Sequence, residues 1–192
     1  MRIFLAGASG VIGTSLLPLL VEAGHTVAGM TRSPEKVPAV QALGAEPVLC
    51  DVYDAGSLRD AVVSFGPDMV MHQLTDLPDD AARIAAHSAR ADRMISEGTR
   101  NLVAATQAAH ALRLLAQSIA WELPGDRGAV YHGHERAVLE TGGVVIRYGQ
   151  LYGAGTYYEA RLPSPPRVSV AQAARRTVEI LDAPAGIVEV VE

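Results

Sequence analysis

The chain has 192 residues, of which 49% are hydrophobic and 19% are charged, and this composition predicts a single packed globular domain over residues 1–192. Its net charge of -5 and its lack of a basic tract argue against a nucleic-acid-binding surface. No apolar run is long enough to span a bilayer, and the lone Cys50 cannot form an intrachain disulfide, so we expect a cytoplasmic protein without a membrane partner.

Short apolar runs alternate with helical stretches along the chain, which predicts an α/β fold with a doubly wound parallel sheet and helices on both faces. The expected elements, in chain order, are strand 2–6, helix 11–23, strand 26–30, helix 34–43, strand 46–50, helix 56–65, strand 69–73, a helical segment within 79–110, strand 113–116, helix 130–140, strand 144–147, helix 170–181 and strand 187–191.

The first strand leads directly into a glycine-rich segment that opens the first helix. The first glycine permits a tight turn, the second lets the backbone approach a pyrophosphate, and the third allows close packing of helix on strand. Free N–H groups at the start of the helix bind phosphates. This arrangement predicts a Rossmann-like dinucleotide site held by Gly7, Ser9, Gly10, Val11, Ile12 and Gly13.

The second strand ends at Thr31, Arg32 and Ser33, where dinucleotide folds meet the adenosine ribose. No carboxylate is present to accept a ribose 2'-hydroxyl, whereas Arg32 between two hydroxyl side chains suits a 2'-phosphate. The sequence therefore predicts NADP(H) in preference to NAD(H). The alternative interpretation of Arg32 is a solvated loop arginine.

The ends of the third and fourth strands supply further cofactor contacts. Asp51, followed by Val52, is placed either to accept an adenine amino proton or to cap the next turn. Gln73, Leu74 and Thr75 lie at the carboxyl edge of the sheet, where ligands bind in such folds. We expect these residues to line the cofactor.

The helical segment within 79–110 is longer than usual for a globular protein. It either breaks near 88–92 or packs against a partner molecule, and its alanines favour a homodimer contact through this segment. A proline-rich stretch at 162–166 separates a small C-terminal helix-strand unit, residues 163–192.

Several segments together carry a family resemblance: 7–13, 50–52, 97–102, 117–120 and 147–155. They resemble the extended or atypical short-chain dehydrogenase/reductases, specifically the nucleotide-sugar epimerase-like proteins of the NAD(P)-dependent epimerase/dehydratase family. The resemblance implies pyrophosphate at the three glycines, 2'-phosphate at Arg32 and adenine at Asp51. It also implies the nicotinamide end at Tyr148 and Gly149, with Ser118 orienting a substrate carbonyl.

Members of that family carry a Tyr-x-x-x-Lys pair, but the single lysine here is Lys36. If Tyr131 is the tyrosine, Glu135 stands at the lysine position; in the other register Arg127 and Tyr131 replace tyrosine and lysine. A tyrosine without the lysine is only about 0.1% ionised at pH 7, a deficit of about 4 kcal/mol as a base and none as an acid.

We therefore expect a small carbonyl-containing substrate to be reduced or epimerised, with Tyr131 giving a proton and Ser118 holding the substrate oxygen. The alternative is a cofactor-binding protein without redox turnover, such as a regulator, a scaffold or a non-redox cyclase or lyase, with Tyr131 as a surface residue. His132 and His134 are candidate proton-transfer groups that point apart on a helix, and no metal site is expected because a third ligand is lacking. Arg147 either binds an anionic substrate or pairs with a carboxylate.

Overall fold

The computed structural model describes residues 1–78 and 80–192. Its central feature is a seven-stranded, fully parallel sheet in the order β3-β2-β1-β4-β5-β6-β9. The strands are β1 Arg2–Ala6, β2 Thr26–Thr31, β3 Glu46–Leu49, β4 Met69–His72, β5 Arg113–Ile119, β6 Val144–Tyr148 and β9 Gly186–Val190. The strand order reverses between β1 and β4, which opens a crevice at their carboxyl ends. The predicted fold class is confirmed.

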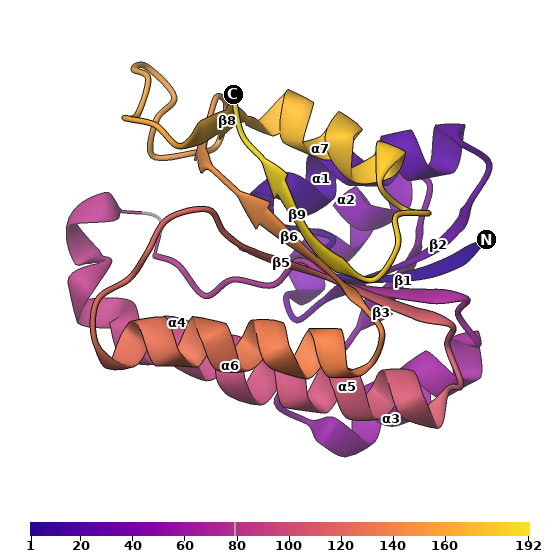
Figure 1. Cartoon of the computed structure of the whole chain (residues 1–192). Helices are drawn as coiled ribbons and strands as arrows, with labels where there is room; N and C mark the ends of the chain where they lie inside the picture. Colours follow the sequence, from indigo (N-terminus) through magenta and orange to yellow (C-terminus); the bar gives the residue numbers. More distant parts are fainter. Residues whose placement is uncertain (79) are drawn as a thin grey trace.

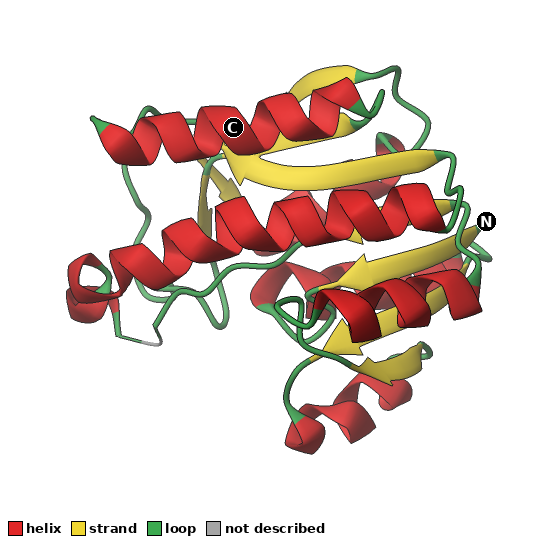
Figure 2. Ribbon diagram, turned by 90° about the horizontal axis from the view of Figure 1, so that it is seen from below, coloured by secondary structure: helices red, strands yellow, loops and turns green. Residues whose placement is uncertain are grey.

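Helices cover both faces of this sheet (Figure 1). One layer contains α1 Val11–Glu22, α2 Val37–Ala42 and α7 Val170–Glu179, and the other contains α3 Ala55–Phe65, α5 Thr99–Ala108 and α6 Asp126–Glu140. Figure 2 shows the strands side by side behind the second of these helical layers. The arrangement explains why the strands read as continuous apolar runs, since neither face is left to water.

Two hydrophobic clusters fill the spaces on either side of the sheet. Strand β1 divides its side chains between them, with Ile3 and Leu5 in the cluster under α1 and α7 and Phe4 in the cluster under α3 and α5. This division follows from the two-residue period of a strand. Because all three side chains are fully buried, the strand that leads into the glycine turn is held rigidly from both sides.

The long helical segment predicted within 79–110 is interrupted. Two 3-10 turns, Ala81–Arg83 and Ala85–His87, precede α4 Ser88–Arg93, which runs through a π-helical turn, Met94–Gly98, into α5. The interruption therefore falls just before Ser88, at the edge of the interval where the sequence predicts a break. Residue 79, the start of the predicted segment, lies outside the described residues.

Several predicted boundaries were wrong. Helix α6 begins at Asp126, four residues before the predicted start, because glycines on either side of that start weaken the helical signal. Strand β5 continues to Ile119, so Ser118 lies within the strand. The short strands β7 Gln150–Tyr152 and β8 Arg167–Ser169 pair with each other and were not predicted, since three residues carry too little periodicity to be detected.

The C-terminal elements are packed into the rest of the fold. Helix α7 lies against α1, and β9 pairs with β6 at the edge of the large sheet. Figure 1 shows α7 and α1 in the same layer. The first helix, which carries the glycine turn, therefore has the sheet on one side and α7 on another.

Candidate functional site

The glycine turn leaves no room for side chains at two of its three glycines. Gly7 has a φ of +96°, and a Cβ built there would lie 2.5 Å from the carbonyl oxygen of Gln73. A Cβ on Gly13 would lie 2.1 Å from the carbonyl oxygen of Gly7. These distances are far below van der Waals contact, so α1 can pack on the turn only because both positions are glycine.

The start of α1 has no internal partner for its positive end. The helix has no side-chain cap and no acidic residue in its first turn, so its first free N–H groups face outward. At this end Val11 is partly exposed and Ile12 is buried. A Cβ on Gly10 would meet only the Gly7 carbonyl, so its outer side is open. These features fit a pyrophosphate held by backbone amides.

Beside this turn, the end of β2 is organised by Thr31. Its hydroxyl lies 2.9 Å from the Ser9 hydroxyl and accepts a hydrogen bond from the Ser33 backbone N–H at 3.2 Å. The structure thus joins Ser9 of the predicted glycine-rich segment to Thr31 and Ser33, which with Arg32 are the residues that the sequence predicts at the ribose. None of these contacts involves a carboxylate on β2.

Arg32 reaches across to Asp76 in the loop after β4. Its Nη2 lies 3.1 Å from Asp76 Oδ1, and Arg90 of α4 approaches the same carboxylate with Nε at 3.2 Å and Nη2 at 3.1 Å. The Asp76 side chain is 10% exposed, whereas those of Arg32 and Arg90 are 44% and 59% exposed. The largely covered Asp76 carboxylate therefore binds two guanidinium groups, both of which are partly exposed to solvent.

The third strand ends in a capped turn. Asp51 Oδ1 accepts a hydrogen bond from the backbone N–H of Tyr53 at 3.0 Å, which is the capping alternative for this residue. Val52 is buried, and its carbonyl accepts from the Asn101 amide at 2.9 Å. An adenine contact at Asp51 stays a prediction, and it would use the second carboxylate oxygen.

A buried polar network joins the carboxyl ends of β4 and β5. The Leu74 N–H donates to His72 Nδ1 at 3.3 Å, and His72 Nε2 lies 3.1 Å from the Thr99 hydroxyl. That hydroxyl lies 2.6 Å from His134 Nδ1, and His134 Nε2 donates to the Gln117 carbonyl at 2.9 Å. The Gln117 side-chain amide donates to the Leu74 carbonyl at 2.9 Å, which completes a ring of hydrogen bonds. These five residues form the His72–His134 network.

Both imidazoles of this network are neutral. Burial lowers the pKa of His72 well below its usual value, and the neighbouring His134 lowers it further. Burial also lowers the pKa of His134, although its hydrogen bond to Gln117 opposes the shift. Neutral rings fix the hydrogens, because His72 must accept from Leu74 at Nδ1 and His134 must donate to Gln117 at Nε2. The Thr99 hydroxyl therefore accepts from His72 Nε2, and its single hydrogen lies between the Ile95 carbonyl oxygen at 2.5 Å, to which it donates, and His134 Nδ1 at 2.6 Å.

A cleft opens beside the end of β5, next to this network. It is lined by Ser118, Ile119, Ala120, Trp121, Glu122, Leu123, Gly128, Tyr131, His132, Glu135, Arg147 and Glu189 and has a volume of about 110 Å³. Both residues predicted to be catalytic, Ser118 and Tyr131, line it. Of the two candidate histidines, His132 is exposed at the cleft and His134 is buried.

Glu135 is the central group of the cleft. Its Oε1 accepts hydrogen bonds from the Ser118 hydroxyl at 2.6 Å and from Arg147 Nε at 2.8 Å, while Oε2 accepts from Arg147 Nη2 at 2.6 Å. Burial alone would raise the pKa of Glu135, but the hydrogen bonds from Arg147 and Ser118 outweigh it and hold that pKa below its usual value. The carboxylate is thus ionised, and Arg147 takes the carboxylate-pairing alternative.

Tyr131 stands one helical turn before Glu135 on α6. Burial raises the pKa of its phenol, with Arg127 opposing the shift, so the hydroxyl is protonated at neutral pH.

At the end of β6, the Tyr148 side chain is fully buried and its hydroxyl lies 2.5 Å from the Thr177 hydroxyl. A Cβ on Gly149 would lie 2.6 Å from the Arg167 backbone, so this turn also requires glycine.

Sequence reasoning missed the role of Glu135 and of Thr99. In the sequence, Glu135 was noted only as the residue at the expected lysine position. An acidic residue on a helix and Arg147 at a strand end were the available signal for an ion pair between them. Thr99 gave no signal of its own, because nothing in the sequence places its hydroxyl between two histidines.

Within residues 1–78 and 80–192, no helix could cross a membrane and no cluster of three His, Cys, Asp or Glu residues could hold a metal ion.

Comparison with known proteins identifies the cofactor class. A family model described as NAD(P)H-binding matches residues 7–140. The 3-diazoavenalumate denitrifying reductase of a Streptomyces species is 35% identical over 185 residues, which cover 82% of this chain and 59% of that protein. The chain thus spans less than two thirds of the length of that curated relative.

Solved structures share the fold at lower identity. UDP-glucose 4-epimerase of Thermotoga maritima superposes with a TM-score of 0.81 at 15% identity, covering 100% of this chain and 77% of that one. The anaerobillin reductase ChuY of Escherichia coli O157:H7 superposes with a TM-score of 0.71 at 17% identity, covering 100% of this chain and 97% of that one. The chain therefore belongs to the NAD(P)H-binding family and has the fold of the extended short-chain dehydrogenase/reductases of the epimerase/dehydratase type.

Proposed function

We propose that this protein is an NADPH-dependent reductase that transfers hydride to a small unsaturated electrophile, such as a carbonyl compound, in the cleft beside β5. The observation that carries the proposal is the position of this cleft. Ser118 near the end of β5 and Tyr131 on α6 line it, at the same edge of the parallel sheet from which the glycine turn leaves β1. A dinucleotide lying along this edge has its pyrophosphate at α1 and its other end at the cleft.

In this proposal NADPH, when bound, supplies the hydride, and the residues of the cleft orient the electrophile. Tyr131 acts as a proton donor because burial keeps its phenol protonated. Ser118 and Arg147 are both tied to Glu135, which fixes the floor of the cleft in one geometry. The positive charge nearest Tyr131 is that of Arg127, which is paired with Asp92 and is outweighed by burial, so the phenol stays protonated and the reductive direction is favoured over alcohol oxidation.

The preference for NADPH rests on the two arginines at Asp76. Arg32 follows β2, where the 2'-phosphate of NADP lies in such folds, and both Arg32 and Arg90 keep donors that Asp76 does not use. A phosphate dianion can accept these donors in charge-assisted hydrogen bonds, whereas the 2'-hydroxyl of NAD offers no charge. We therefore propose that Arg32 selects NADPH.

A reductase is favoured over an epimerase by the similarity to the Streptomyces protein, which its name describes as a reductase acting on 3-diazoavenalumate. That name also extends the range of electrophiles beyond carbonyls. The alternative of cofactor binding without redox turnover draws on one observation, the ionised Glu135 at the position where the family's lysine is expected.

The cofactor assignment is tested by calorimetric titration of NADPH and NADH. We expect NADPH to bind at least about tenfold more tightly, since hydrogen bonds to charged groups contribute about 1.5–3 kcal/mol. Arg32→Ala should remove this preference. Arg59→Ala, which deletes an exposed arginine on α3, is the matched control and should retain it. Equal affinities in the unmodified protein would refute the assignment.

The turnover assignment is tested by following NADPH absorbance with a panel of small carbonyl and imine compounds. Tyr131→Phe should slow turnover of a carbonyl substrate, in which an alkoxide must be protonated. NADPH binding without oxidation by any member of the panel would favour the alternative without redox turnover. Unchanged rates in Tyr131→Phe would remove Tyr131 from the mechanism.

We also propose a homodimer that uses the helical segment after residue 80. A groove of about 320 Å³ between α5 and α6 is lined mainly by small and apolar side chains, among them Val103, Ala129 and Ala137. A second copy would bury this surface. Light scattering that gives a monomer mass at micromolar concentration would reject the dimer.

A further inference from the structure

Gln73, the first residue after β4, has a side-chain amide that is buried without a hydrogen-bond partner. The residue is 5% exposed. Its Nε2 and Oε1 are the only buried side-chain nitrogen and oxygen atoms in residues 1–78 and 80–192 that make no hydrogen bond. Buried amides are almost always paired, because an unpaired donor or acceptor costs folding free energy. The exception at Gln73 therefore points to a partner that is not part of the folded chain.

The position of Gln73 along the sheet edge places it beneath the nicotinamide half of a bound dinucleotide. Strand β4 lies between β1, which carries the glycine turn, and β5, which carries Ser118. The Gln73 backbone N–H donates to the Ala6 carbonyl at 2.8 Å, directly beside the turn. A cofactor with its pyrophosphate at α1 and its nicotinamide at the cleft beside β5 has to cross the end of β4.

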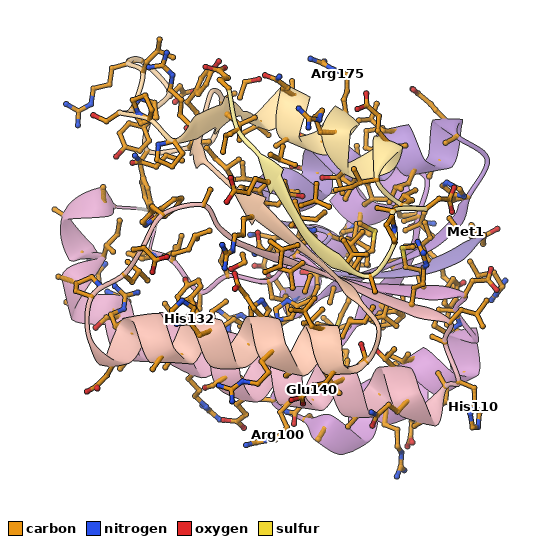
Figure 3. All side chains as sticks on the ribbon, viewed as in Figure 1. Met1, Arg100, His110, His132, Glu140 and Arg175 are labelled. Carbon is orange, nitrogen blue, oxygen red and sulfur yellow. The ribbon has the colours of Figure 1, made fainter. Side chains whose placement is uncertain are left out.

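The side chain of Gln73 lies on the face of the sheet that α1 and α7 cover. Met71 packs in the hydrophobic cluster on that face, and side chains two residues apart on a strand share a face. Tyr148, at the end of β6, belongs to the same cluster. Thr177 is on the buried side of α7, whereas Arg175 is exposed and points outward (Figure 3). Gln73, Tyr148 and Thr177 thus meet between the sheet and α7.

The Tyr148 hydroxyl does not complete the Gln73 amide. Burial raises the pKa of Tyr148 to about 12, and the nearby Thr177 and Gln73 oppose this shift. The Thr177 hydroxyl donates to the Ala173 carbonyl at 2.7 Å, so the Tyr148 hydroxyl donates to Thr177 at 2.5 Å. No hydrogen of Tyr148 is then left for Gln73 Oε1. Among the described residues, the Gln73 oxygen lacks a donor and its nitrogen lacks an acceptor.

We propose that Gln73 binds the carboxamide of the nicotinamide ring, an inference that rests on the proposed function. A carboxamide offers an N–H donor beside a carbonyl acceptor, which complements the unpaired oxygen and nitrogen of Gln73. No hydrogen bond holds the Gln73 amide in place, so it can turn toward the cofactor without breaking one. Binding the carboxamide fixes the rotation of the nicotinamide ring and therefore the face of the ring that is turned to the substrate.

The first test compares NADP⁺ with 2'-phospho-ADP-ribose, which keeps the 2'-phosphate, the pyrophosphate and the terminal ribose but lacks the nicotinamide. Gln73→Leu replaces the amide by an apolar side chain of similar size. In calorimetric titration the variant should bind NADP⁺ about tenfold more weakly, the net strength of two neutral hydrogen bonds, and 2'-phospho-ADP-ribose with unchanged affinity. The melting temperature of the unliganded variant should rise, because two unpaired polar atoms leave the core.

A second comparison needs only the unmodified protein. In the 3-acetylpyridine analogue of NADP⁺ a methyl group replaces the carboxamide nitrogen, so the donor to Gln73 Oε1 is lost. The unmodified protein should bind this analogue several-fold more weakly than NADP⁺, and Gln73→Leu should bind the two about equally. Gln107→Leu, the same change at an exposed position on α5, is the matched control and should leave all three affinities unchanged.

The inference is overturned if Gln73→Leu binds NADP⁺ as tightly as the unmodified protein does. It is also overturned if the variant loses as much affinity for 2'-phospho-ADP-ribose as for NADP⁺, since the amide would then serve the ribose. Equal affinity of the unmodified protein for NADP⁺ and the acetylpyridine analogue overturns it even if the variant does not fold. Each of these results leaves the proposed function intact as long as NADP⁺ binds; without binding of the coenzyme in either redox state, the proposed function itself fails.

Discussion

The His72–His134 network makes a quantitative prediction at Thr99. The hydroxyl of this residue, which is 1% exposed, lies 3.1 Å from His72 Nε2, 2.6 Å from His134 Nδ1 and 2.5 Å from the Ile95 carbonyl. Thr99→Val keeps the shape but leaves two buried imidazole nitrogens without a partner. Each such loss costs about 1–3 kcal/mol, so the free energy of unfolding should fall by about 2–6 kcal/mol.

Thr99→Ser is the matched control, because it keeps the hydroxyl and deletes one buried methyl group, a loss of about 1 kcal/mol. Urea denaturation at pH 7.5, followed by circular dichroism, measures both variants on one scale. The valine variant should have the lower midpoint with an unchanged slope. If it is as stable as the serine variant, the Thr99 hydroxyl does not hold the two histidines, and its role in the network is wrong.

Two further predictions concern the two buried histidines and the glycines of α1 and α6. Lowering the pH from 7.5 to 5.5 should lower the melting temperature, because His72 and His134 stay neutral in the folded state while an unfolded histidine titrates near 6.5 and takes up a proton; a melting temperature that is constant over this range would contradict buried neutral imidazoles. Gly13→Ala should abolish NADPH binding or folding, since its Cβ would lie 2.1 Å from the Gly7 carbonyl, whereas Gly133→Ala, at a helical position with nothing within 4 Å, should raise stability by up to about 1 kcal/mol in thermal unfolding.

The sequence predicts the sheet and the glycine turn well, because both are encoded locally. Apolar runs such as 2–6 and 69–73 must be buried on two faces, and this requirement is visible in any window that contains them. Gly7, Gly10 and Gly13 likewise lie within seven consecutive residues, so the turn that they form can be recognised from one short segment of sequence. The ionic contact of Arg32 is different, because its partner Asp76 lies 44 residues away and no local pattern links the two.

The cleft could be predicted only in part for the same reason. Position and resemblance predict Ser118 and Tyr131, which line the cleft, but they do not predict that Glu135 joins Ser118 to Arg147, because these two partners come from different strands. The Thr99 hydroxyl is positioned by the register between α5 and α6, which depends on the π-helical turn before it. Such registers are set by packing, and sequence periodicity does not determine them.

The contact between α7 and α1 also has a consequence for biosynthesis. Helix α1 spans Val11–Glu22 and its covering helix spans Val170–Glu179, so about 150 residues must be translated between the two. Until then the apolar side of the first helix stays open to solvent on the nascent chain, where it is a target for chaperones and for aggregation. Contacts this distant in sequence also slow the search for the native topology, so the phosphate cradle should be among the last parts of the molecule to become rigid.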